Sequence, residues 1–202
     1  MEFYDGTLEG AKVVVVQSGV GKVNAAMCVQ ILSDLFEVTH VMNTGVAGSL
    51  NAKLDIGDIL VSIDAVQHDV DATIFGYAKG QVPGTKDRAY YANEVLRKEI
   101  VAACKSVNPD INVLEGHVVS GDQFISSAEV KENLIREFNG DCAEMEGASI
   151  AQAAYFNELP FVIIRAISDK ADGSAEMDYP AFEKQAAEHC AKMVREFLKN
   201  QE

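Results

Sequence analysis

Short apolar runs alternate with amphipathic stretches along the whole chain. Residues 13–16 form an unbroken β-branched run, which is typical of a strand buried on both faces. Residues 24–36 instead place apolar side chains at helical spacing. This alternation predicts an α/β fold, a three-layer αβα sandwich with a mainly parallel central sheet. The expected strands are residues 13–16, 41–44, 58–66, 113–119 and 161–167, and the expected helices are residues 24–36, 87–107, 127–138, 147–157 and 180–198.

The chain has no linker, internal repeat or low-complexity segment. Its 202 residues are enough to bury a proper core, so we expect a single domain over residues 1–202. The stretch 68–85 contains Gly76, Gly80, Pro83 and Gly84 and is expected to be a long loop. Loops of that length within a compact domain are often functional.

The chain is strongly acidic, with a formal net charge of −14. This charge argues against a nucleic-acid partner and against an anionic membrane surface, because both attract clustered Lys and Arg. The four cysteines and four histidines are scattered, so we expect free thiols, no metal site and no cofactor. The N-terminus does not have the pattern of a signal peptide, and no apolar run is long enough to span a membrane. We therefore expect a cytoplasmic protein.

Two glycine-rich turns follow expected strands. Residues 18–22 read Ser-Gly-Val-Gly-Lys, which lacks the glycine spacing of a nucleotide-triphosphate loop. Residues 44–48 read Thr-Gly-Val-Ala-Gly and end the next strand. Such a turn either lets the backbone approach a ligand closely or is needed only for its shape, and the residues leave both interpretations open.

Acidic side chains also lie at expected strand ends, where open α/β sheets bind ligands. Glu144 and Glu146 straddle one residue, so one of them is expected to hold the two hydroxyls of a ribose and the other to cap the following helix. Asp169 follows Ser168 at the end of a buried strand and is either a turn cap or a general acid. Arg165 lies within the same apolar run and needs a buried partner, either one of these carboxylates or a bound water.

Together these motifs resemble the 5'-methylthioadenosine/S-adenosylhomocysteine nucleosidases of the nucleoside phosphorylase superfamily, and the resemblance covers essentially the whole chain. The motifs that carry it, in family order and spacing, are residues 18–26 (SGVGKVNAA), 43–48 (NTGVAG), 68–69 (HD), 75–77 (FGY), 120–125 (SGDQFI), 143–146 (AEME) and 165–169 (RAISD). The resemblance implies a nucleoside phosphorylase-like fold and hydrolysis of an N-glycosidic bond, with release of adenine.

The resemblance also implies roles for individual residues. Asp169 would protonate N7 of adenine with help from Ser168, Glu146 would hold the ribose hydroxyls, and Arg165 would contact the attacking water. Phe124, which from its neighbours alone is either a stacking or a core aromatic, would sandwich the nucleoside with Met145. The other implied substrate-binding residues are Val20 and Tyr179 at the 5'-alkylthio group, Val46, Ala47 and Gly48 beside the ribose, Ile125 at the adenine edge, and Glu144. Phe75 and Pro83 would reach into the pocket of a partner subunit, which implies a homodimer.

Two departures from the family pattern bear on activity. The segment Met1–Tyr4 matches a stretch well inside that pattern, so we expect the chain to lack a central strand and the Glu that activates the attacking water. Val46 stands where many members have a serine that helps to hold this water. An active hydrolase is therefore one interpretation, and a catalytically impaired nucleoside-binding protein or a truncated gene product is another. A purine nucleoside phosphorylase is a weaker alternative, because no motif gathers the arginines that phosphate would need.

Overall fold

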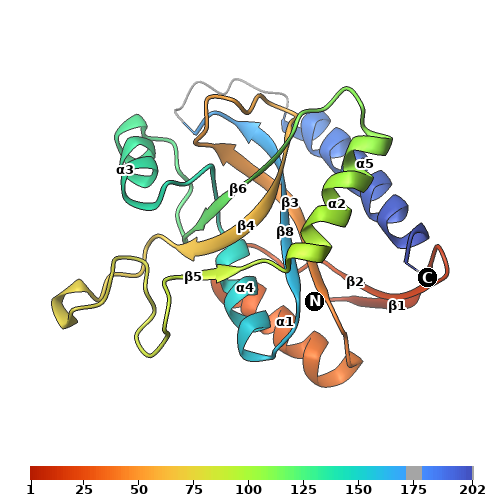
Figure 1. Cartoon of the computed structure of the whole chain (residues 1–202), viewed down its shortest axis with the longest axis horizontal. Helices are drawn as coiled ribbons and strands as arrows, with labels where there is room; N and C mark the ends of the chain where they lie inside the picture. The colour runs from red at the N-terminus through yellow and green to blue at the C-terminus, as the bar shows by residue number, and fades with distance from the viewer. Residues whose placement is uncertain (172–178, 202) are drawn as a thin grey trace.

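The computed structural model of the chain describes residues 1–171 and 179–201 (Figure 1). At its centre is a six-stranded sheet in which β4 also pairs with β8, so that five strands close on themselves. The strand order is β5 (Ala89–Tyr91), β4 (Ile59–Gln67), β6 (Val113–Ser120), β7 (Cys142–Glu144), β3 (Val41–Ser49) and β8 (Phe161–Asp169). The pairs β3–β8, β4–β6 and β6–β7 are parallel, whereas β4–β5, β3–β7 and β4–β8 are antiparallel. The α/β fold is confirmed, with a mixed central sheet.

Helices cover both faces of this sheet (Figure 1). The strands explain why, since β8 sends Ile163 into one apolar cluster and Ile164 into another. Helices α1 (Lys22–Phe36) and α4 (Gly147–Phe156) contribute to the first cluster, and α2 (Glu94–Val107) and α5 (Tyr179–Lys199) to the second. Helix α3 (Ala128–Phe138) packs Leu134 and Phe138 into a third cluster. None of the helices within the described residues is both long and apolar enough to span a membrane.

The first apolar run of the chain does not join the central sheet. Strands β1 (Phe3–Leu8) and β2 (Ala11–Val16) form a separate antiparallel hairpin. Its turn residues Glu9 and Gly10 both have positive φ, as the preferred two-residue hairpin turn requires. Val15 is 58% exposed, so the expectation of a strand buried on both faces is wrong here. A β-branched run favours extended backbone, but it does not determine which sheet the strand joins.

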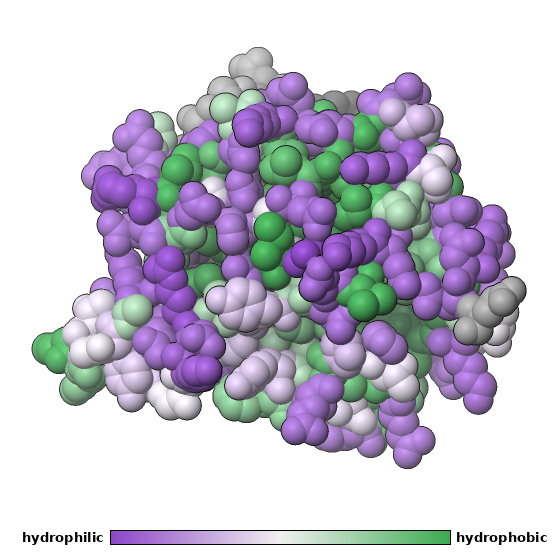
Figure 2. All heavy atoms as spheres, viewed as in Figure 1, coloured by the Kyte–Doolittle hydropathy of each residue, from purple (hydrophilic) through white to green (hydrophobic). Residues whose placement is uncertain are grey.

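The segment between β4 and α2 differs from the prediction at its end. Strand β5 occupies residues expected to be helical, and α2 begins only at Glu94, where the Asn93 side chain accepts a hydrogen bond from the Leu96 amide. Before β5, the chain projects from the body and carries the short 3₁₀ helix η1 (Thr73–Phe75) (Figure 1). Hydrophobic atoms mark the tip of this projection in Figure 2. The expected long loop is thus confirmed, and Ile74 and Phe75 in η1 are exposed.

Candidate active site

The ends of three strands bring the acidic motifs together. Gly48, near the end of β3, pairs with Ala143 of β7 on one side and with Asp169 of β8 on the other. Ala143 directly precedes Glu144, so the two acidic motifs of the sequence flank the same glycine. A Cβ atom on Gly48 would lie 2.9 Å from Oδ1 of Asp169. The lack of a side chain therefore lets the β3 backbone lie against this carboxylate.

Asp169 is oriented by two hydrogen bonds. The Ser168 hydroxyl donates to Oδ2 at 2.8 Å, and the amide of Ala171 donates to Oδ1 at 2.7 Å. Ser168 Oγ also lies 3.3 Å from the carbonyl oxygen of Ala47, which places the hydroxyl between β3 and β8. Asp169 itself is partly exposed. A carboxyl group that is fixed at one edge and still reachable by solvent suits proton transfer to a bound ligand.

Glu144 and Arg165 form a buried ion pair, with side chains that are 2% and 1% exposed. Nε of Arg165 lies 3.1 Å from Oε2 of Glu144, and the guanidinium also donates to Asn43 Oδ1. The Glu144 carboxylate also accepts hydrogen bonds from the Ser120 hydroxyl and from the amide of Gly147 at the start of α4. The expected carboxylate partner of Arg165 is confirmed. Glu144 takes the helix-capping role expected for one member of the pair.

Glu146 is left as the carboxylate that can face a ligand. Its Oε1 accepts a hydrogen bond of 2.8 Å from the amide of Gly21, and its side chain is only partly buried. Burial raises the pKa of Glu146, and the Glu144 carboxylate adds to this rise, while the Gly21 amide and Arg165 act in the opposite direction. Such a group is poorly solvated, so hydroxyl donors from a ligand would stabilise its ionised form.

Gly21 has a backbone that only glycine adopts without strain. Its φ of 92° and ψ of 162° place it in a region that is essentially restricted to glycine. This conformation turns the Gly21 amide towards Glu146. Gly21 is also the residue that directly precedes α1. The Ser18–Lys22 turn therefore presents a backbone donor to a carboxylate of the same chain.

The apolar residues that the sequence placed at the ligand fall into exposed and buried groups. Phe124 is 77% exposed and Val20 is 69% exposed, so Phe124 is not a core aromatic. Met145 is partly buried between Glu144 and Glu146, and Ile125 is buried in the cluster that contains α3. Ala47 is buried and Val46 packs against a small cluster with α5, while the side chain of Tyr179 lies outside the described part of the chain.

Phe75 and Pro83 lie on the projecting loop. Phe75 is 80% exposed at the end of η1, and Pro83 is also exposed. Within this chain neither residue belongs to the described clusters of buried apolar side chains or to the strand-end site.

Three polar residues that the structure places beside this site had no predicted role. Lys22, Asp69 and Asp122 follow β2, β4 and β6 and are joined to one another by hydrogen bonds. Asp69 and Asp122 belong to the motifs quoted above, and their positions just after expected strands were the available signal. Asn43, the acceptor for Arg165, was likewise part of a motif without an assigned role.

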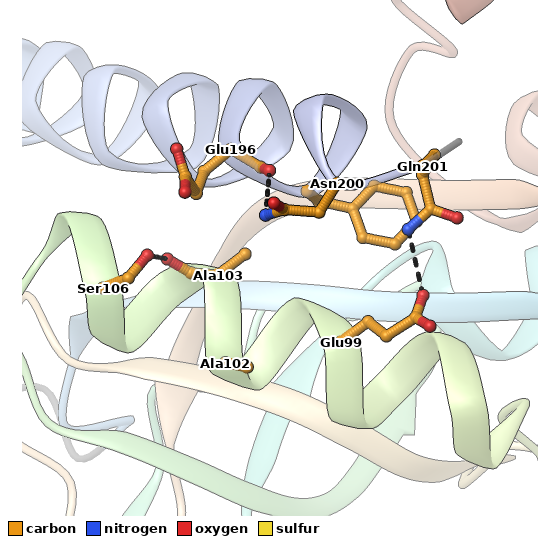
Figure 3. Close-up of a pocket in the computed structure, with 8 residues that line it drawn as sticks. Glu99, Ala102, Ala103, Ser106, Glu196, Asn200 and Gln201 are labelled. Carbon is orange, nitrogen blue, oxygen red and sulfur yellow. Dashed lines mark hydrogen bonds between the residues drawn. The ribbon is translucent and has the colours of Figure 1, made fainter.

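A pocket of about 320 Å³ lies elsewhere, between α2 and α5 (Figure 3). Its polar residues are already engaged locally, since Gln201 donates to Glu99 and Asn200 donates to the Glu196 carbonyl. None of the residues that line this pocket belongs to the sequence motifs. The lining residues are Glu99, Ala102, Ala103, Ser106, Glu196, Phe197, Asn200 and Gln201. The acidic groups of the sequence motifs and the glycines beside them lie at the strand ends and not at this pocket.

Known proteins match the chain over nearly its whole length. The pattern of the Phosphorylase superfamily covers residues 1–199. A 5'-methylthioadenosine/S-adenosylhomocysteine nucleosidase of Halalkalibacterium halodurans is 42% identical over 194 residues, which are 96% of this chain and 83% of the relative. The nucleosidase of Neisseria meningitidis, solved with methylthio-immucillin-A, has a TM-score of 0.90 at 40% identity, with 98% of this chain and 85% of that chain covered.

A structural neighbour with a different name has nearly the same fold. The futalosine hydrolase of Helicobacter pylori has a TM-score of 0.89 at 35% identity, with 96% of this chain and 82% of that chain covered. The higher identities are to the nucleosidases. The chain belongs to the Phosphorylase superfamily and, within it, to the 5'-methylthioadenosine/S-adenosylhomocysteine nucleosidases.

Proposed function

We propose that this chain hydrolyses the N-glycosidic bond of 5'-methylthioadenosine and S-adenosylhomocysteine and releases adenine and the 5'-thio-ribose. The observation that carries the proposal is the position of Gly48, which pairs with Asp169 on one side and with the strand leading to Glu146 on the other. A proton donor and a hydroxyl-binding carboxylate thus flank one strand end. A nucleoside needs both groups, one at its base and one at its sugar.

The reaction would break the bond between C1' of the ribose and N9 of adenine. The bonding electrons leave with adenine, and N7 accepts a proton from Asp169. A water oxygen bonds to C1' and gives up a proton to solvent, from which Asp169 is protonated again. Ser168 holds the Asp169 carboxyl during this transfer. Glu146 accepts hydrogen bonds from the ribose hydroxyls, whose polarity grows as the sugar gains positive charge, so this contact is stronger in the transition state.

The remaining ligand contacts are proposed from the surface that surrounds these two groups. Exposed Phe124 offers a face on which adenine stacks opposite Met145, and the Ile125 backbone is assigned to the adenine edge. Val46, Ala47 and Gly48 form the strand end beside the ribose. Val20, which is exposed on the turn before α1, is assigned to the 5'-alkylthio group together with Tyr179.

We also propose that the active unit is a homodimer. Ile74 and Phe75 are 87% and 80% exposed on a loop that projects from its own chain. Large apolar side chains at such a position favour insertion into a partner. Phe75 and Pro83 would then close the pocket of the second subunit. The four buried free cysteines fit a reducing compartment, which supports the cytoplasm as the location.

The test is adenine release from the purified 202-residue chain. We expect release from methylthioadenosine and adenosylhomocysteine, no dependence on added phosphate, and slower reaction with futalosine. Nucleoside binding without turnover would support the impaired binding protein instead. Phosphate-dependent formation of a ribose 1-phosphate would overturn hydrolysis in favour of the phosphorylase.

A further inference from the structure

Three segments that follow strands β2, β4 and β6 are joined by a closed ring of hydrogen bonds. Nζ of Lys22 lies 2.7 Å from Oδ1 of Asp69, the Asp122 amide donates to Oδ2 of Asp69 at 3.0 Å, and the Lys22 amide donates to Oδ1 of Asp122 at 2.8 Å. We call Lys22, Asp69 and Asp122 the strand-exit ring. Asp69 is its centre, because each of its carboxylate oxygens accepts from a different segment.

The ring is shielded more than an ordinary surface ion pair. The side chains of Lys22 and Asp69 are 20% and 15% exposed, and Nζ of Lys22 also donates to Gln67 Oε1 at 3.1 Å. Burial alone would raise the pKa of Asp69, but the hydrogen bonds from Lys22 and Asp122 and the charge of Lys22 hold it below its ordinary value. The carboxylate is therefore the form that the ring stabilises.

The ring lies next to both ends of the proposed nucleoside site. Gly21, whose amide donates to Glu146 at 2.8 Å, immediately precedes Lys22, and Oδ1 of Asp122 lies 3.0 Å from where a Gly21 Cβ would be. Asp122 is two residues before Phe124. Moving any member of the ring would displace the backbone donor of Glu146 or the aromatic face for adenine.

We propose that Lys22, Asp69 and Asp122 are positioning residues, and that the ring they form sets the Gly21 amide against Glu146 and the Phe124 segment against the base. The functional consequence rests on the proposed nucleosidase activity. The ring acts through Glu146 and Phe124 and touches no reacting atom.

A positioning role has a pH signature that general stabilisation does not share. The Gly21 amide lowers the pKa of Glu146, so loosening the ring lets this pKa rise further. The other charged groups that face Glu146 are Glu144 from β7 and Arg165 from β8, and neither belongs to the ring. His68, beside Asp69, has a pKa lowered chiefly by burial. The acidic limb of kcat/KM should therefore move to higher pH when the ring is broken.

The sharpest variant is Asp69→Asn. An asparagine replaces one carboxylate oxygen by an NH2 group, which is a donor, so it cannot accept at both of the positions where Lys22 and the Asp122 amide donate. We expect kcat/KM to fall about tenfold to hundredfold, as a small misplacement of binding groups does, with the acidic limb displaced to higher pH. Lys22→Met should do the same, and Lys22→Arg, which keeps charge and donors, should recover most of the loss. The matched controls are the same substitutions at exposed positions, Asp34→Asn on α1 and Lys53→Met.

Hydrogen exchange of residues 18–24 and 120–125 gives a measurement that does not depend on turnover. We expect faster exchange of both segments in Asp69→Asn and Lys22→Met, and wild-type exchange in Lys22→Arg and in the controls. If the wild-type chain releases no adenine, the proposed function fails, and exchange alone then decides whether the ring holds both segments. Unchanged exchange, or lost activity without displacement of the acidic limb, would overturn the proposal. Failure of Asp69→Asn to fold leaves the Lys22 pair to decide it by the same criteria.

Discussion

At the scale of single residues, the two carboxylates that we propose to face the ligand have different surroundings. Asp169 is fixed by a hydroxyl and an amide from its own strand end, whereas Glu146 is held by one amide from the distant Gly21 turn. Burial raises the pKa of Glu146. Environments that differ in this way allow two carboxyl groups in one site to take different roles.

Replacing Asp169 by asparagine removes the proposed proton donor and keeps the shape of the side chain. We expect kcat for adenine release to fall by about a hundredfold to ten-thousandfold, because a lost general acid typically costs that much. KM should change little, since Asp169 is not proposed to bind the ground state strongly. Steady-state kinetics measure both values, and a variant with wild-type turnover would remove Asp169 from the acid role.

Glu146→Gln should lower the activity of the protein and raise its thermal stability. A group whose pKa is raised on folding contributes stability below its unfolded pKa, and this contribution is lost as pH rises through the folded pKa. At neutral pH the ionised Glu146 therefore destabilises the fold, and glutamine, which can still accept from the Gly21 amide, should raise the unfolding temperature while activity falls. The gain should vanish in acid. If Glu146→Gln and the wild-type chain had the same unfolding temperature at neutral pH as well as in acid, this reasoning would be contradicted.

At the scale of elements, the Glu144–Arg165 pair joins β7 to β8 and anchors the start of α4. Arg165→Met would leave a buried carboxylate without its counter-charge, so we expect unfolding free energy to drop by about 3–5 kcal/mol. The matched control is Arg195→Met, which breaks a pair with Glu9 in which the arginine is exposed and should cost about 1 kcal/mol or less. Denaturant unfolding of the two variants compares them directly, and similar losses would show that burial of the pair adds nothing.

Element prediction succeeded where local pattern and tertiary burial agree. Helices α4 and α5 begin and end within a residue or so of the expected ranges, and β8, apolar on both faces, lies in the interior as expected. The three-residue β7 is too short for a periodic signal, and β5 was hidden in a stretch with helical spacing. The site motifs follow strands and were visible for that reason. The hydrogen bonds of the strand-exit ring were not predictable, although its members belong to those motifs, because the three residues are distant in sequence and meet only through the topology of the sheet.

At the scale of the whole molecule, the proposed dimer has a consequence that no single chain shows. If Phe75 closes the pocket of the partner, each site combines Asp169 and Glu146 from one subunit with Phe75 from the other. Sedimentation at micromolar concentration should give a dimer. A monomer that retains full activity would contradict the shared site.

Subunit mixing tests the shared site itself. In a heterodimer of Asp169→Asn and Phe75→Ala chains, one site carries both lesions and the other carries neither. Random pairing makes about half of the dimers mixed, so co-expressed variants should recover about a quarter of wild-type activity. Asp169→Asn paired with Glu146→Gln is the control, because both lesions belong to the same chain's site and every site stays damaged. Recovery in the first mixture alone would place Phe75 in the partner's pocket, and no recovery would confine each site to one chain.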